Sequence, residues 1–137
     1  MDLFDVKISE GELRQMSSLG LAHIGDAVYE LLVRSHMCRE GMETAKSLHR
    51  AAVRYVSAPA QAQAAGLILP HLTEEERAVF RRGRNTRVNS VPSRATIEQY
   101  HAATGLEALF GFLYLRGERE RISELFSIIT EEENDAS

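Results

Sequence analysis

One carboxylate lies in a segment that is otherwise apolar. Residues 102–115 read AATGLEALFGFLYL, and Glu107 is the only charged residue among them. In a helix, Glu107 shares a face with Ala103 and Gly111, small residues that leave space around it. A helix that is apolar on all sides is buried, and a buried carboxylate must meet a cation or a hydrogen-bond donor. Two interpretations stay open: a functional carboxylate, or a structural ion pair with an arginine from another helix.

A second carboxylate, Asp26, lies in another apolar segment, LAHIGDAVYELLV at residues 21–33. Helical spacing aligns it with polar residues on neighbouring turns, among which Glu30 and Arg34 form an ordinary i,i+4 pair. A solvated polar stripe of this kind needs no function. Taken alone, Asp26 is therefore better explained as a surface residue than as a site residue.

Together the two carboxylates predict a metal site. Proteins hold Mg²⁺ by one or two carboxylates, with water and substrate phosphate completing its ligands. The metal then activates a water molecule and stabilises charge on a phosphodiester. We therefore expect Asp26 and Glu107 to be both metal ligands and catalytic residues, with Mg²⁺ as the cofactor and Mn²⁺ as a substitute.

Basic residues concentrate between these carboxylates in the sequence. The chain has a net charge of −4, yet residues 44–97 contain nine Lys or Arg against three Glu. No acidic residue occurs at positions 77–97, which include Arg81, Arg82, Arg84 and Arg87. Such a segment forms a local surface for polyanions, and arginines free of acidic neighbours favour phosphate contact over a merely solvated loop.

Helical periodicity dominates the chain and no alternating strand pattern is present, so we expect an all-α fold. The predicted helices lie at about 17–37, 44–55, 57–67, 73–82, 95–116 and around 122–129. Thr73 and Glu76 have the spacing of a capping box. A basic loop is expected at 83–93 and a frayed acidic tail at 131–137. We predict one domain over residues 1–137, with its core at about 17–130.

The first long helix carries most of its apolar residues in one predicted stripe. That stripe comprises Leu21, Ile24, Val28, Leu31 and Leu32, widened by Ala22, Tyr29 and Val33. Residues at this spacing form the face that a helix turns toward the core.

Composition excludes several classes of protein. Cys38 is the only cysteine, so an internal disulfide and a Cys-rich zinc site are excluded. The five histidines have no metal-binding spacing and are interpreted as structural or surface residues; His49, beside Arg50, has the best claim to a function. We find neither a signal-peptide pattern nor an apolar run of membrane-spanning length, and expect a cytoplasmic protein with no membrane partner.

At these residues the sequence resembles the ribonuclease III nuclease domain. The hallmark of that family is a helix reading Leu-Glu-x-Leu-Gly-Asp and an apolar helix reading Asp-x-x-Glu-Ala-Leu-x-Gly. The corresponding segments here read LAHIGD and TGLEALFG. Asp26 and Glu107 match two of the family's four metal-site carboxylates, whereas Ala22 and Thr104 stand where the other two belong.

The miniature branch of the family shows the same departures, and the resemblance to that branch spans about Leu19 to Glu124. The further matching blocks are Ile24–Glu30, Leu48–Arg50, Val56–Ala58, Gln61–Ala62 and Arg81–Asn85. Because the nuclease match takes up the chain, we expect no separate double-stranded-RNA-binding domain.

The resemblance implies an all-helical homodimer, with the Asp26 helix near the twofold axis, that cuts duplex RNA. A dimer is also expected because one chain offers a single carboxylate pair and duplex cleavage needs two centres. The implied role is maturation of the large-subunit (23S-type) ribosomal RNA precursor, assisted by a large-subunit ribosomal protein. The residues expected to bind RNA are Arg81, Arg82, Arg84, Asn85, Arg87, Arg50 and His49.

Two other classes of function stay open. A non-catalytic ribonuclease III-like RNA-binding scaffold, associated with ribosome assembly, is favoured by the loss of carboxylates at Ala22 and Thr104. Asp26 and Glu107 argue against it, because an inactive scaffold has no need of a carboxylate in so apolar a helix. A helical protein-interaction domain is disfavoured by the uninterrupted basic stretch.

Overall fold

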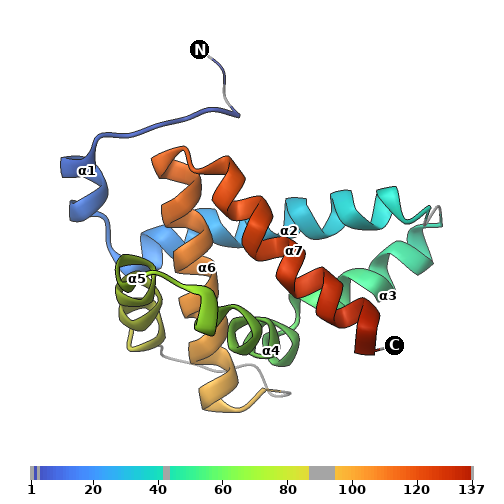
Figure 1. The fold of residues 1–137 in the computed structure, drawn as a ribbon. Coiled ribbons are helices and arrows are strands. Elements are labelled where there is room, and N and C mark those ends of the chain that lie inside the picture. Colours follow the sequence, from blue (N-terminus) through green and yellow to red (C-terminus); the bar gives the residue numbers. More distant parts are fainter. Residues whose placement is uncertain (1, 3, 42–43, 87–94, 137) are drawn as a thin grey trace.

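The described part of the chain is built from helices (Figure 1). The computed structural model describes residues 2, 4–41, 44–86 and 95–136, of which 132–136 are described in the backbone alone. The helices are α1 (Glu10–Gln15), α2 (Ser18–Arg39), α3 (Ala45–Val56), α4 (Ala58–Ile68), the 3-10 turn η1 (Leu69–His71), α5 (Glu74–Arg84), α6 (Ile97–Arg116) and α7 (Arg119–Ala136). No strand occurs in these ranges, so the predicted all-α fold is confirmed. No helix found there is long and apolar enough to cross a membrane.

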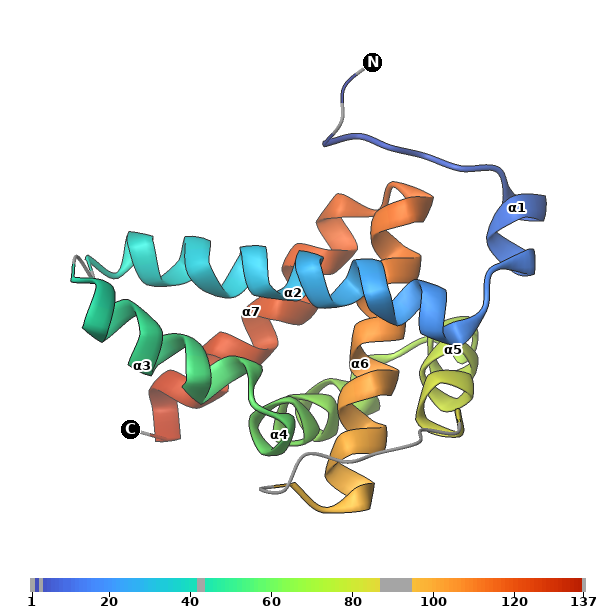
Figure 2. The same ribbon diagram turned by 180° about the vertical axis from the view of Figure 1, so that it is seen from behind.

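Helix α6 runs through the middle of the molecule, and α2, α4 and α5 pack around it (Figures 1 and 2). Eleven of its residues are buried, almost without interruption from Ala103 to Leu115. The prediction that residues 102–115 form a buried helix is therefore confirmed. Its end is set by Gly117, whose φ of +82° is the left-handed conformation in which glycine commonly terminates a helix.

Polar residues at the helix N-termini explain why the predicted boundaries fall close to the observed ones. The side chains of Ser9, Ser17, Thr44, Ser57, Thr73 and Thr96 each accept a hydrogen bond from a backbone N–H three residues ahead. Such caps satisfy N–H groups that have no partner within the helix. The capping box at Thr73 and Glu76 is confirmed, and a second one joins Thr96 and Gln99.

Three details differ from the expectations. Helix α1 and the turn η1 were not predicted. Helix α7 continues through Ala136, so the tail expected to fray from residue 131 has a helical backbone. Helix α5 extends to Arg84, and the basic loop starts at Asn85 rather than Gly83. Tertiary packing explains the extension, because a Cβ on Gly83 would lie 2.9 Å from the Gly105 Cα of α6.

The buried face of α2 also differs from the predicted stripe. The buried residues are Leu21, Ala22, Gly25, Tyr29, Val33 and Met37, whereas Leu31 is 56% exposed. Apolar residues surround most of this helix, so periodicity alone could not decide which of them face the core. The buried face of α2 is set by its contact with α6. That contact requires the face of α2 that carries Gly25 to lie against α6.

The backbones of α2 and α6 meet at two glycines. A Cβ on Gly25 would lie 1.6 Å from the Glu107 carbonyl oxygen, and a Cβ on Gly111 would lie 2.0 Å from the Leu21 carbonyl oxygen. No side chain larger than hydrogen fits at either position without moving a helix. The crossing therefore sets the distance between the helices that carry Asp26 and Glu107.

We expect Gly25→Ala to lower the free energy of unfolding by about 3 kcal/mol or more, at or above the upper end of typical overpacking costs. The matched control is Gly66→Ala in α4, where an added Cβ would meet nothing within 4 Å. That variant should gain roughly 0.5–1 kcal/mol, because alanine is the better helix former. Chemical denaturation of both variants measures the difference, and equal stabilities would contradict the close crossing.

Candidate active site

The structure brings Asp26 of α2 and Glu107 of α6 together beside the glycine crossing. Asp26 directly follows Gly25, which contacts the backbone of Glu107, and the two carboxyl groups are within hydrogen-bonding contact. Asp26 is exposed, whereas Glu107 is largely withdrawn from solvent. The pair thus has one side open to solvent and one side in the core.

Neither carboxylate is part of an ion pair within the described ranges. The structural alternative for Glu107, an arginine from another helix, is therefore not observed there. The alternative for Asp26 is met in part, because Glu30 and Arg34 do form their i,i+4 pair at 3.1 Å. A solvated stripe does not explain why Asp26 touches a second carboxyl group from another helix.

A third group, Gln61 of α4, completes the surroundings of Glu107. Its side chain is 3% exposed and lies close enough to the Glu107 carboxyl group to lower the pKa of that group. In the sequence, Gln61 stands within a block that matches the miniature branch, and no role was predicted for it. The signal available was a helix of small apolar residues, APAQAQAAGLI, in which two glutamines occur and one must face the core.

The surroundings of Glu107 make its ionisation unfavourable. Burial raises the pKa of Glu107 to about 8, with the adjacent Asp26 carboxylate adding to the rise and the Gln61 amide opposing it. Without a cation, the raised pKa favours the protonated form of Glu107 at neutral pH, beside the Asp26 carboxylate. A bound cation would remove the repulsion that keeps the proton in place.

The donor set fits a divalent cation that retains water. Asp26 and Glu107 supply carboxylate oxygens, the ligands that Mg²⁺ prefers. Ala22 is buried and apolar, and the Thr104 hydroxyl donates to the Tyr100 carbonyl at 3.0 Å. Among the residues that the structure describes, no cluster of three or more His, Cys, Asp or Glu is present. Water and substrate would therefore have to supply the remaining ligands.

The predicted cations of α5 lie close to this pair. Arg81, Arg82, Arg84 and Asn85 are exposed at the C-terminal end of the helix. Gly83, which lies between these residues in the chain, packs closely on α6. A Cβ on Gly83 would meet Ala108 and the carbonyl oxygen of Thr104, residues near Glu107 in α6. A basic surface thus lies beside the segment that carries Glu107. Arg87, also predicted to bind RNA, lies outside the described residues.

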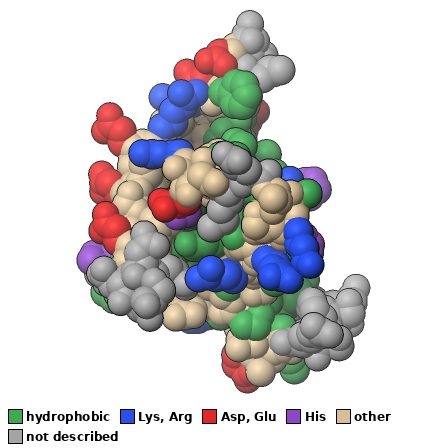
Figure 3. Space-filling model, turned by 90° about the vertical axis from the view of Figure 1, so that its right-hand side faces the viewer, with side chains coloured by type: hydrophobic (Ala, Val, Ile, Leu, Met, Phe, Trp, Pro, Cys, Tyr) green, Lys and Arg blue, Asp and Glu red, His purple; other side chains and the backbone are tan. Residues whose placement is uncertain are grey.

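The predicted residues of α3 form a second basic surface. Arg50 and His49 are exposed, and Arg50 shares an exposed face with Lys46 and Arg54 around a shallow hollow of about 480 Å³. Figure 3 shows this side of the molecule, with Lys and Arg side chains at its lower centre and right and several acidic side chains along its left edge. Helix α3 packs on α2 and α4, the helices that carry Asp26 and Gln61.

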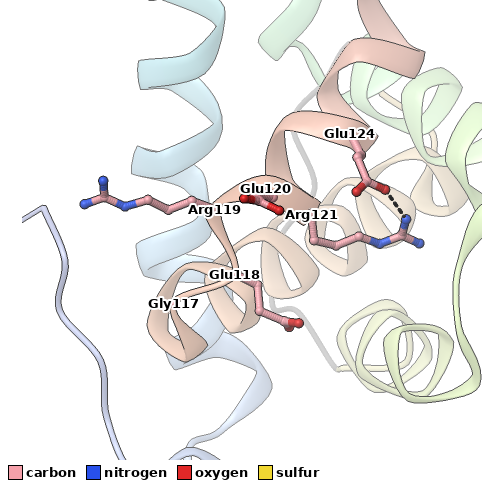
Figure 4. A pocket seen from close by; sticks show the side chains of 6 residues that line it. All are labelled: Gly117, Glu118, Arg119, Glu120, Arg121 and Glu124. Atoms are coloured by element: carbon pink, nitrogen blue, oxygen red, sulfur yellow. Dashed lines mark hydrogen bonds and ion pairs between the residues drawn. The ribbon is translucent and has the colours of Figure 1, made fainter.

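A second hollow, at the junction of α6 and α7, has a structural explanation. It measures about 430 Å³ and is lined by residues 117–121 and Glu124 (Figure 4). Its Arg121 is engaged: Nε lies 2.8 Å from one Glu76 carboxylate oxygen, and a terminal nitrogen lies 2.9 Å from the other. These bonds lower the pKa of Glu76 and join α5 to α7.

Comparison with known proteins shows the family of this chain. Residues 19–118 match the Ribonuclease III domain family model. The chain belongs to the ribonuclease III family. As a member of that family it is an endoribonuclease, a hydrolase of RNA phosphodiester bonds. The expectations on family, fold class and enzymatic nature are confirmed.

Curated relatives place the chain near one branch of the ribonuclease III family. It is 48% identical over 107 residues to Mini-ribonuclease 3 of Symbiobacterium thermophilum, which covers 78% of this chain and 82% of that protein. It is 40% identical over 124 residues to Mini-ribonuclease 3 of Clostridium tetani, covering 90% and 82% respectively. A crystal structure of a Fusobacterium nucleatum protein superimposes with a TM-score of 0.81 at 30% identity, covering 89% of this chain and 98% of that one.

The raised pKa of Glu107 gives a prediction about stability in chelating buffer. Between pH about 4.5 and about 8, the folded protein holds a proton that the unfolded chain has lost. The free energy of unfolding should therefore fall as pH rises through this window. Glu107→Gln should remove that part of the fall and unfold at a higher temperature than wild type at pH 8. The control, Glu98→Gln on the exposed start of the same helix, should follow the wild-type curve; superimposable curves for all three proteins would contradict the assignment.

Proposed function

We propose that the chain is a Mg²⁺-dependent endoribonuclease of double-stranded RNA, in which Asp26 and Glu107 hold the metal. The contact between these two carboxyl groups, which no cation of the described chain neutralises, is the observation that carries the proposal. Two adjacent carboxylates are costly unless a cation joins them. Mn²⁺ has the same preference for oxygen ligands and should substitute.

The residues of the chain have distinct tasks in hydrolysis. A metal held by Asp26 and Glu107 would stabilise charge at the scissile phosphate and make a bound water molecule more acidic. Asp26 lies on the solvent side of the pair and faces the approaching phosphodiester, whereas Glu107 is held from the core side. Water adds to phosphorus as the bond to the 3′ oxygen breaks, and that oxygen takes a proton. The products are a 5′-phosphate and a 3′-hydroxyl, as the family resemblance implies.

The basic surfaces would bind the RNA backbone. Arg81, Arg82, Arg84 and Asn85 lie beside the Glu107 segment, and phosphate contacts there would place a strand at the carboxylate pair. His49 and Arg50 of α3, and Arg87, are proposed as further contacts. Duplex RNA presents phosphates and 2′-hydroxyls rather than free bases, which suits a surface rich in arginine.

The resemblance to the miniature branch supports the finer proposals. We propose a cytoplasmic homodimer, with one carboxylate pair for each strand, that matures the large-subunit (23S-type) ribosomal RNA precursor with the help of a large-subunit ribosomal protein. The second candidate function is a non-catalytic RNA-binding scaffold. It is favoured by Ala22 and by Thr104, whose hydroxyl is engaged with Tyr100.

Replacing either carboxylate should separate the enzyme from the scaffold. Asp26→Asn and Glu107→Gln should each reduce cleavage of labelled duplex RNA by on the order of 10²-fold or more, since even residues that only support metal ligands cost 10- to 100-fold. The double variant should be little worse than either single one, because ligands of one metal act as a unit. Duplex binding and the dimer mass from light scattering should be retained.

The matched control for these variants is Glu30→Gln, one turn from Asp26 on the exposed stripe of α2. It removes the same charge and should cut at close to the wild-type rate. Wild-type protein that binds duplex RNA but never cuts it with Mg²⁺ or Mn²⁺ would establish the scaffold instead. Loss of RNA binding together with early unfolding of Asp26→Asn would mean that the carboxylate is structural.

The arginines at the end of α5 should carry a salt-dependent part of RNA binding. Replacing Arg81, Arg82 and Arg84 with Gln should weaken binding to a similar extent for duplexes of different sequence. Each lost phosphate contact should flatten the slope of log K against log salt by roughly 0.7 to 0.9. The matched control for the single variant Arg82→Gln is Arg14→Gln, which removes one charge from the exposed face of α1. Equal losses of RNA affinity in the two variants would show that only the net charge matters.

A further inference from the structure

Gln61 is a polar side chain in a place where an apolar one would suit the fold. It is 3% exposed, and its helix neighbours Ala64, Ala65 and Ile68 are buried on the same side of α4. Burying an amide is unfavourable unless its hydrogen bonds are satisfied. The amide is buried where α4 packs against α6, beside the carboxyl group of Glu107, whose pKa it lowers. The same helix carries Gln63 on its exposed face.

The Glu107 carboxyl group therefore lies between two helices besides its own. It contacts Gln61 of α4 on the core side and Asp26 of α2 on the solvent side. With one contact on each side, the carboxyl group has little freedom to rotate. Groups that orient a metal ligand in this way commonly control the affinity of the site.

The neutral charge of Gln61 matters as much as its position. An arginine in its place would pair with Glu107 and neutralise it, as Arg121 pairs with the buried Glu76. Such an arginine would compete with a metal cation for the carboxylate. An amide can orient the carboxylate and still leave its negative charge available. The neighbouring hydroxyl that could do the same, that of Thr104, is engaged with the Tyr100 carbonyl.

We infer that Gln61 is a positioning residue that holds the Glu107 carboxyl group toward Asp26 and so sets the affinity of the pair for a divalent cation. The inference rests on the proposed function, because it takes Asp26 and Glu107 as the cation site. Gln61 itself acts through Glu107 and is assigned no contact with RNA.

The test replaces the amide by apolar side chains of similar size, Gln61→Met and Gln61→Leu, with Gln63→Met as the matched control. Mn²⁺ binding to each metal-free protein is measured by titration calorimetry, without RNA. We expect the Gln61 variants to bind Mn²⁺ roughly 10- to 100-fold more weakly and the Gln63 variant to bind it like wild type. The rise in melting temperature on adding Mn²⁺ should shrink in parallel.

Cleavage kinetics give a second readout. At low Mn²⁺ the Gln61 variants should cut slowly, and a high Mn²⁺ concentration should restore most of kcat, whereas Asp26→Asn should not recover. A merely structural role predicts the reverse pattern: a lower melting temperature without metal, unchanged Mn²⁺ affinity, and no rescue by Mn²⁺. That pattern would overturn the inference.

The outcome also separates this inference from the proposed function. If wild type does not bind Mn²⁺, or Asp26→Asn binds it like wild type, the carboxylate pair is not the cation site and both fail. If Asp26→Asn loses Mn²⁺ while both Gln61 variants bind it like wild type, the proposed function stands and the role of Gln61 is wrong.

Discussion

The close crossing of α2 and α6 is the constraint on which the rest of the structure depends. Gly25 and Gly111 let the two backbones touch, and a Cβ at either position would overlap a carbonyl oxygen of the other helix. Asp26 follows Gly25 in the chain, and Glu107 contributes the carbonyl that Gly25 contacts. The residues that hold the core together therefore also fix the carboxylate pair. A change that loosened the crossing would weaken packing and disperse the site at once.

The buried Glu76 and the half-buried Glu107 have opposite environments. Glu76 meets Arg121 through two hydrogen bonds, and its pKa is lowered, so its charge is fully neutralised inside the fold. Glu107 meets an amide and a second carboxylate, and its pKa is raised. The first arrangement stabilises the joint between α5 and α7. The second keeps Glu107 protonated until a cation binds, so cation binding must displace that proton; perturbed carboxyl groups of this kind are common at functional sites.

The distribution of charge suits an acidic protein that acts on a polyanion. The net charge is −4, yet the exposed C-terminal end of α5 carries arginine, and the outer face of α3 carries arginine and lysine, without acidic partners in the described residues. Because α5 packs against α6 through Gly83 and Gly105, the basic end of α5 is held beside Glu107. Packing of small residues thus places both the negative and the positive parts of the site.

The sequence by itself determined the local features. Caps such as Thr73 and Thr96, the apolar run around Glu107, and the family motifs that contain Asp26 act within a few residues, so they can be read from the chain alone. Only the tertiary structure decided which face of α2 is buried, where the basic loop begins, and that Gln61 rather than Gln63 reaches Glu107. Each of these depends on contact with α6, a partner distant in sequence, and periodicity cannot select among apolar faces before that partner is in place.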